Sequence, residues 1–377
     1  MAETSVTVGR SESDRLRKGG WFSQLVHRPE IGAFSGMMVV LIGLYFLAGD
    51  VVYNPLGIKN NLAIISQLGI IAIGACLLMI AGEFDLSIGS MIGFSGMSMA
   101  MMMKWGLPFG LGEATPMAAF FITLAMTLAI GCLIGNIVVR SGLSSFIVTL
   151  GFLFALRGLT EVCFREFNEG STQISGLPDF KETDWFAYLF GGETFKWVFS
   201  LLYEFGWNLN RRGDQWVGGL DAKVAWWIIL AILAYVVLSR TQLGNWIYAT
   251  GDNKESARAN GVPVNQVKIG LFMFTAFCAT LFAACQVFDT NTADAAKGNL
   301  KELEAIAAAV VGGTLMTGGF GSVVGVIFGA VIFGLVQNSV FYIPWIDGSY
   351  YRVFLGTVLL IAAFANERIR KRFTGGI

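Results

Sequence analysis

Two carboxylates, Glu83 and Asp85, interrupt a long stretch of otherwise apolar residues. A charge at membrane depth costs at least about 2.5–3.5 kcal/mol, so it is normally paired, capped or exposed to a water-filled path. Asp85 can cap the following helix by accepting hydrogen bonds from the amides of Ser87 and Ile88. It can also line a path or gate for a polar cargo. The two roles can coexist, and Phe84, Asp85 and Ser87 are the candidate path residues.

A second informative stretch lies between residues 240 and 267. Asp252 is a candidate N-cap, and Glu255 three residues later gives a capping-box arrangement. Gly261 then ends the helix and Pro263 prevents its continuation. A two-turn helix held between two membrane spans has no core in which to be buried. It is therefore either a solvated connector or a contact site for another protein.

Several other chemistries lack the side chains they need. The single histidine, His27, lies in the basic N-terminal tail, and the five cysteines have no metal-type spacing, so we expect no His-centred metal or acid–base site. No Gly-xxxx-Gly-Lys-Ser/Thr phosphate loop is present. Any ATP hydrolysis is therefore expected on a separate polypeptide, and the chain is expected to bind no cofactor of its own. The net charge of zero indicates no nucleic-acid partner.

These polar stretches must be positioned by membrane helices. The 377 residues are 55% hydrophobic and 14% charged, whereas about a quarter of the residues in a soluble chain are charged. The charges fall between long apolar runs, as is typical of a multi-pass membrane protein. The first run follows a basic tail, residues 1–32, and we expect it to be retained as a transmembrane helix rather than removed as a signal peptide.

Ten apolar runs approach the roughly 20 helical residues that cross a bilayer. The sequence predicts an all-α membrane protein with about ten transmembrane helices, whose membrane domain covers residues 33–366. The eighth run is the weakest, because it is short and begins with Glu302 and Glu304. The predicted spans are 33–52, 62–81, 86–103, 117–139, 144–162, 223–239, 268–287, 302–317, 322–340 and 350–366.

The distribution of Lys and Arg gives the orientation. With both termini in the cytoplasm, fourteen of these residues fall in the inner segments and four in the short outer loops, which is a clear positive-inside bias. The tails 1–32 and 367–377 and the loop 240–267 are then cytoplasmic. The insert 163–222 is periplasmic in a bacterial inner membrane. Arg157 and Arg352 lie near the outer ends of their predicted spans, where each either contacts an external partner or extends to the interface.

The insert is rich in aromatic residues, which favour the headgroup zone. A helix lying on the outer surface is expected near residues 194–206. It is either a docking platform for an external partner or an interfacial anchor without a recognition role.

Two glycine-containing turns resemble each other. Residues 82–93 and 318–329 each place a turn after an apolar run and a Gly-xxx-Gly helix after the turn. Transporters are often built from repeated halves, and chance similarity between glycine-rich spans explains the likeness equally well.

The loop 240–267 resembles the coupling segment of ABC importer permeases of the monosaccharide family, which includes ribose, xylose and galactose permeases. Three further stretches of the chain resemble that family in the expected order: residues 82–90, residues 146–158 and residues 302–322. Glu83 departs from the family pattern, where a small residue is usual. The positions that match the coupling segment, together with the candidate cap, are Gly251, Asp252, Asn253, Glu255, Ala257, Arg258 and Gly261.

The resemblance implies a permease subunit that moves a monosaccharide across the inner membrane. Its implied partners are a cytoplasmic ABC ATPase that holds the ATP, a periplasmic sugar-binding protein and a second copy of the permease. One alternative is a permease of the same architecture for branched-chain amino acids or nucleosides. Another is an ion-coupled secondary carrier, in which Glu83 and Asp85 would form the ion site.

Overall fold

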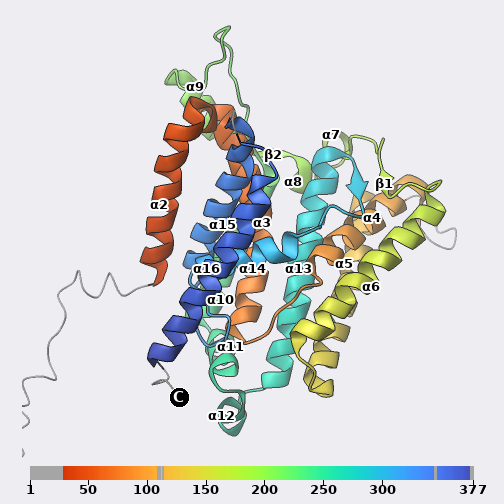
Figure 1. The fold of residues 1–377 in the computed structure, drawn as a ribbon. Coiled ribbons are helices and arrows are strands. Elements are labelled where there is room, and N and C mark those ends of the chain that lie inside the picture. Colours follow the sequence, from red (N-terminus) through yellow and green to blue (C-terminus); the bar gives the residue numbers. More distant parts are fainter. Residues whose placement is uncertain (1–28, 108–111, 113, 344–345, 374–377) are drawn as a thin grey trace, which may run out of the picture.

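The protein is a multi-pass helical membrane protein in this computed structural model, which describes residues 29–107, 112, 114–343 and 346–373. Within these residues, seven helices are long and apolar enough to cross a membrane (Figure 1). This agrees with the predicted all-α fold. The seven are α2 (Pro29–Ala48, extended by the 3-10 turn η2, Gly49–Val52), α3 (Pro55–Ile80), α5 (Pro116–Ser141), α6 (Ser145–Phe167), α10 (Ala222–Arg240), α13 (Val264–Thr290) and α15 (Val323–Ser339, extended by η4, Val340–Tyr342).

The other three predicted spans are also helices, but they are not among these seven. They are α4 (Ile88–Trp105), α14 (Lys301–Val311) and α16 (Tyr350–Phe373). The prediction of a span at 302–317 was too long. At 1.5 Å per residue, the eleven residues of α14 cover only about 16 Å. A turn follows directly, in which Gly313 has a φ of +91°, so α14 reaches only part of the way through a bilayer.

Two helices form the centre of the bundle. In the most apolar 18-residue stretch of α3, and in that of α13, 83% is buried inside the protein. The corresponding stretch of α2, which stands at the edge of the bundle (Figure 1), is only 11% buried. Helix α13 packs against α5 and α4, and α3 packs against α15, α10 and α14. A centre made of two largely buried helices leaves the outer helices to face lipid or another protein chain.

The predicted insert is partly helical. It contains α7 (Phe180–Thr183), α8 (Trp185–Gly191) and α9 (Lys196–Glu204), with the short strands β1 (Gln173–Ile174), β2 (Glu193–Thr194) and β3 (Leu220–Asp221). Strand β1 pairs with β4 (Ala293–Asp294), and β2 pairs with β3. Helix α9 falls within the predicted surface helix at 194–206, and Trp197 on it is 71% exposed. The insert lies at the end of the molecule opposite α12 (Lys254–Ala259) (Figure 1).

Glycines allow α5 to approach α13 closely. A Cβ atom added at Gly131 would lie 2.8 Å from the Phe272 carbonyl oxygen, and one added at Gly135 would lie 2.9 Å from the Ile269 Cα. Both distances are shorter than real Cβ contacts, so the two backbones touch without side chains between them. Small residues at such contacts are how helices associate in lipid, where packing replaces the exclusion of water.

We expect Gly131→Ala to lower the free energy of unfolding by about 1–3 kcal/mol, because the added methyl group overpacks the α5–α13 contact. Gly151→Ala in the neighbouring α6 is the matched control, since a Cβ there meets nothing within 4 Å, and alanine favours the helix. Thermal unfolding of the purified protein in detergent measures both. Equal midpoints for the two variants would show that α5 and α13 do not pack as described.

Candidate functional site

The predicted short helix exists in the 240–267 loop and follows a second helix. Helix α11 (Gln242–Asp252) precedes α12. The predicted N-cap was wrong by one residue, because Asp252 is the last residue of α11. Asn253 caps α12 instead, and its Oδ1 atom accepts hydrogen bonds from the amides of Glu255 at 3.1 Å and Ser256 at 3.0 Å. Asn253 has an extended backbone, so α11 ends before it and α12 begins after it as a separate helix.

The end of α12 follows the prediction. Gly261 has a φ of +81°, in the left-handed region, and the amide of Val262 donates to the Ala257 carbonyl at 3.0 Å. This bond across a left-handed glycine is the Schellman type of helix termination. Pro263 then precedes α13.

Helix α12 projects from the end of the molecule (Figure 1). Among its six residues only Ala257 is buried, and the side chains of Glu255 and Arg258 are 71% and 46% exposed. These two form an ion pair at 3.3 Å, and Arg258 also donates to Asn265 on α13 at 2.8 Å. An exposed ion pair contributes little stability, so exchanging it for contacts with another protein would cost little. The α12 surface is therefore available to a partner.

The end of α11 is fastened by four glycines, which we call the glycine junction: Gly82, Gly251, Gly318 and Gly319. The Gly319 amide donates to the Ile80 carbonyl at 2.8 Å. A Cβ added at Gly251 would collide with that same carbonyl oxygen. One added at Gly318 would lie 2.8 Å from the Gly82 Cα. Gly82, Gly318 and Gly319 also have φ between +76° and +86°, which favours glycine.

The two turns that resemble each other in sequence therefore touch in space. The turn after α3 contains Gly82, and the turn between α14 and α15 contains Gly318 and Gly319. Gly251, at the end of α11, contacts both turns. The segment that presents α12 is thus joined by backbone contacts to the two places where the membrane helices are interrupted.

Asp85 is held by hydrogen bonds inside the bundle. Its Oδ1 accepts from the Ser87 amide at 2.8 Å and the Ser87 hydroxyl at 2.6 Å. Its Oδ2 accepts from the Thr275 hydroxyl at 2.6 Å. The predicted bond from the Ile88 amide is not made, because α4 begins at Ile88 and Asp85 lies before its first turn. Asp85 therefore ties the start of α4 to α13, and both of its carboxylate oxygens have partners.

The neighbours of Asp85 are also engaged. Glu83 forms an ion pair with Lys268 near the start of α13, and each side chain is 12% exposed. The Phe84 amide donates to the Ser145 hydroxyl at 3.1 Å, and its side chain packs against the core. A lysine partner compensates the unusual charge of Glu83. Both carboxylates therefore have protein partners in this structure.

A second polar group, which the sequence analysis did not identify as a unit, lies between α4, α6 and the start of α14, where Glu302 is buried, Arg157 is half-buried and Asn299 is exposed. We call it the polar centre: Gly89, Arg157, Asn299 and Glu302. Arg157 donates to Asn299 Oδ1 at 2.9 Å and lies 4.0 Å from the Glu302 carboxylate. The Glu302 side chain rests directly on Gly89, where a Cβ would overlap its Oε2 atom. Arg157 is thus half-buried and bonded to Asn299 at the start of α14.

The polar centre joins three of the four sequence stretches that resemble one family. Gly89 belongs to 82–90, Arg157 to 146–158 and Glu302 to 302–322. The sequence signal that could have revealed this group is the presence of Arg157 and Glu302, which have opposite charges, in two different apolar runs. Within the described residues, no group of three or more His, Cys, Asp or Glu side chains is placed to hold a metal ion.

We expect Gly251→Ala to open the glycine junction, because its methyl group cannot fit beside the Ile80 carbonyl. The Gly319 amide should lose protection, so hydrogen exchange of a peptide covering 315–322 should rise. Gly270→Ala on α13 is the control, because a Cβ there meets nothing within 4 Å. Unchanged exchange in Gly251→Ala would show that the junction is not closed.

The comparisons with known proteins agree on one family. The profile of the branched-chain amino acid transport system / permease component family matches residues 57–363. The chain is 29% identical to a ribose import permease protein of Escherichia coli (strain K12), over 86% of this chain and 91% of that protein. It is 26% identical to a ribose import permease protein of Bacillus subtilis (strain 168), over 90% and 93%.

A xylose transport system permease protein of Escherichia coli (strain K12) is 27% identical, over 91% of this chain and 96% of that protein. No solved structure matches the chain. The family profile covers most of the chain and includes the glycine junction, the polar centre and α12. The chain therefore belongs to the branched-chain amino acid transport system / permease component family.

Proposed function

We propose that this protein is the permease subunit of an ATP-driven importer that carries a monosaccharide across the bacterial inner membrane. The cargo class is supported by the ribose and xylose permeases that the chain resembles over most of its length. The observation that supports an importer of this type is α12, an exposed capped helix whose base is locked to two interrupted membrane helices.

The orientation follows from charge and shape. Helix α12, with Lys254 and Arg258, belongs to the cytoplasmic side by the positive-inside rule, and the insert with α7, α8 and α9 belongs to the periplasm. Both termini are then cytoplasmic. Ten helices lie in the membrane, and α14 enters it only in part.

The motor is a separate ABC ATPase that binds α12 from the cytoplasm and holds the ATP. Its closure would move the α12 segment, provided that the ATPase binds α12 differently in its two states. The rigid contacts of the glycine junction would transmit that movement to the turn at Gly82 and the turn at Gly318. Ser87 and Asp85, next to the first turn, would then shift relative to Thr275 on α13 and open or close the path.

The two remaining partners are a binding protein on the side of the membrane opposite α12 and a second copy of the permease beside this chain. A periplasmic binding protein would deliver sugar at the insert, where exposed aromatic residues such as Trp197 are available. A second copy of the permease would complete the path, since one ATPase pair acts on two equivalent α12 helices. The chain itself would bind no cofactor.

Branched-chain amino acids are the second candidate cargo, because the description of the family names them. The deciding assay is uptake into proteoliposomes that contain the permease, its ATPase and its binding protein. Labelled D-ribose, D-xylose and L-leucine serve as cargo. We expect uptake of a sugar that requires ATP and the binding protein and is unaffected by an ionophore. Uptake without the ATPase, or abolished by an ionophore, would establish a secondary carrier.

Gly261→Pro should reduce ATP-driven uptake at least tenfold, because proline cannot adopt the φ of +81° at this position, and the end of α12 would unwind. Glu255→Arg should act similarly by reversing an exposed charge on the docking surface. Both variants should keep the thermal stability of the membrane domain to within about 0.5 kcal/mol, since surface changes have small effects on stability.

Co-purification with the ATPase measures the docking step directly. Glu166→Arg, a charge reversal on an exposed residue of α6, is the matched control and should retain the ATPase fully. Normal ATPase retention and normal uptake in both α12 variants would remove α12 from the coupling mechanism.

A further inference from the structure

A groove of about 500 Å³ opens between α10, α11 and α13, in the half of the membrane domain that lies on the α12 side. Leu233 of α10 lines one side of it, Phe274 and Phe277 of α13 line the other, and Trp246 of α11 lies at the end near α12. Leu233 is 56% exposed, so the groove is open to whatever surrounds the bundle.

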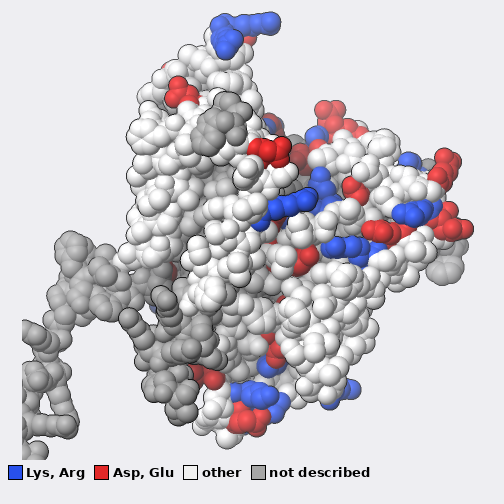
Figure 2. Space-filling model, in the orientation of Figure 1, with Lys and Arg blue, Asp and Glu red and all other residues white. Residues whose placement is uncertain are grey.

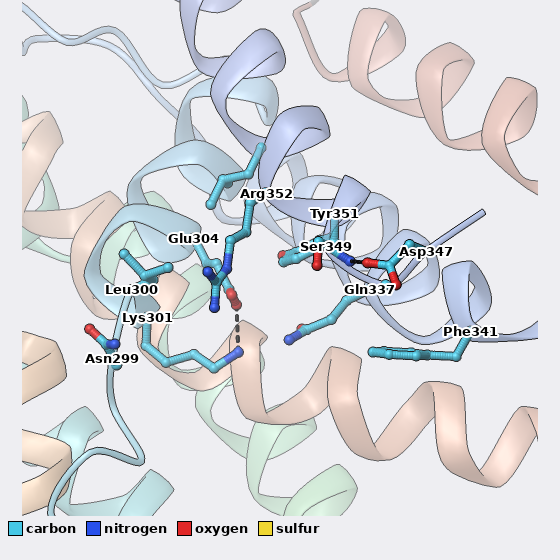
Figure 3. A pocket seen from close by; sticks show the side chains of 12 residues that line it. Asn299, Leu300, Lys301, Glu304, Gln337, Phe341, Asp347, Ser349, Tyr351 and Arg352 are labelled. Atoms are coloured by element: carbon cyan, nitrogen blue, oxygen red, sulfur yellow. Dashed lines mark hydrogen bonds and ion pairs between the residues drawn. The ribbon is translucent and has the colours of Figure 1, made fainter.

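The wall of this groove is almost entirely hydrocarbon. Its polar side chains are Gln266, at the α12 end, and the indole of Trp246, and among the described residues no charged side chain lines it. The cavity of about 530 Å³ between α14, α15 and α16 differs in this respect, because its wall holds four charged residues (Figure 3): Lys301, Glu304, Asp347 and Arg352. A wall without charge offers no partners to a polar molecule and favours apolar surface. The part of the occupant that lies in the groove is therefore apolar.

The groove has the length of one leaflet of a bilayer. On α13 it runs from Gln266 to Phe277, which at 1.5 Å per residue is about 16 Å along the helix axis. Half of a hydrocarbon core is about 15 Å thick. A transmembrane helix of another chain would need twice this length, and a helix about 10 Å wide fills roughly 400 Å³ in a single turn. The dimensions therefore fit an acyl chain and exclude a whole helix.

A positive charge stands at the α12 end of the groove. Arg240 is exposed and is the last residue of the span α10. It follows Val237 by three positions and Leu233 by seven, so it lies on the stripe of α10 that faces the groove. Gln266 is exposed at the same end of α13. Within the part of the chain that the structure describes, Arg240 forms no ion pair.

This end of the groove is at the level of the lipid headgroups. Figure 2 shows charged side chains gathered at the end of the molecule that carries α12, next to a flank almost free of charge. A guanidinium at this level attracts an anionic phosphate and can donate two hydrogen bonds to it. The apolar wall and the arginine together match the two parts of one molecule, an anionic phospholipid.

We propose that this groove binds one anionic phospholipid of the leaflet on the α12 side. An acyl chain lies along α13 between Gln266 and Phe277, and Arg240 binds the phosphate. The site goes beyond the proposed function, because it requires neither ATP nor a transported molecule. Trp246 and Pro263, which precede and follow α12, both line the groove. The bound lipid therefore contacts both segments that hold α12.

The first test measures lipid binding to the purified full chain in detergent by native mass spectrometry. The probes are dioleoyl phosphatidylglycerol, which is anionic, and dioleoyl phosphatidylcholine, which is zwitterionic. We expect the wild type to bind one phosphatidylglycerol at least tenfold more tightly than phosphatidylcholine. Gly270→Leu should weaken phosphatidylglycerol binding at least tenfold, because Gly270 lines the groove and a Cβ there meets nothing within 4 Å. Leucine favours a helix, so α13 should persist.

Arg240→Gln tests the headgroup contact separately. We expect it to remove the preference for phosphatidylglycerol and to leave the affinity for phosphatidylcholine unchanged. It is a substitution on an exposed residue with little effect on folding, so it decides the proposal even if Gly270→Leu does not fold.

Each variant has a matched control. Gly151→Leu places the same side chain on α6, where a Cβ also meets nothing within 4 Å. Arg140→Gln removes an exposed arginine from the last turn of α5. Both controls should bind phosphatidylglycerol as the wild type does.

Two results would overturn the proposal. One is equal binding of the two lipids to the wild type and to every variant, which would indicate adventitious lipid only. The other is loss of a dimer in Gly270→Leu with unchanged phosphatidylglycerol binding, which would assign the groove to a second copy of the chain. Uptake assays are not involved, so failure of this site and failure of sugar import are distinguishable.

Discussion

The structure depends on one constraint, which is that backbone polar groups inside a bilayer must find partners within the protein. Two turns between membrane helices meet here, one after α3 and one between α14 and α15. The breaks are possible because they lie against each other, so that the Gly319 amide bonds the Ile80 carbonyl. That contact leaves no room for side chains at Gly251 or Gly318. Glycine is therefore required at both positions by the close approach of the backbones, and at Gly318 also by its φ of +86°.

The second constraint on the fold is the free-energy cost of burying charged side chains. Glu83 is paired with Lys268, Asp85 has three hydroxyl or amide donors, and Lys301 is paired with Glu304. Each arrangement satisfies the requirement that an ionised group in the membrane has a partner. The buried polar atoms without partners among the described residues are spread over several helices, and two of them, Arg157 Nη2 and Glu302 Oε2, belong to the polar centre.

Much of this architecture could be predicted from the sequence. Each of the ten apolar runs coincides with a helix, and seven of these helices are long and apolar enough to cross a membrane. Gly261 with Pro263 located the end of α12. The errors have physical causes. Asp252 and Asn253 are both good caps, and only the backbone angle after α11 decides between them. The run at 302–317 was apolar enough to be taken for a span, but the turn at Gly312 and Gly313 ends the helix early. The polar centre was not predicted, because it joins residues more than two hundred positions apart through tertiary packing.

The glycine junction and the polar centre are connected by two short paths. Residues 83–88 run from Gly82 to the start of α4, where Gly89 contacts Glu302. Helix α14 runs from Glu302 back toward the turn at Gly318. A displacement of α11 relative to the junction would therefore reach the polar centre along residues 83–88 and along α14 with the turn that follows it. The turns at Gly82 and at Gly318 thus have two consequences. They allow polar side chains to lie among the membrane helices, and they place the backbone between those helices next to the segment that presents α12.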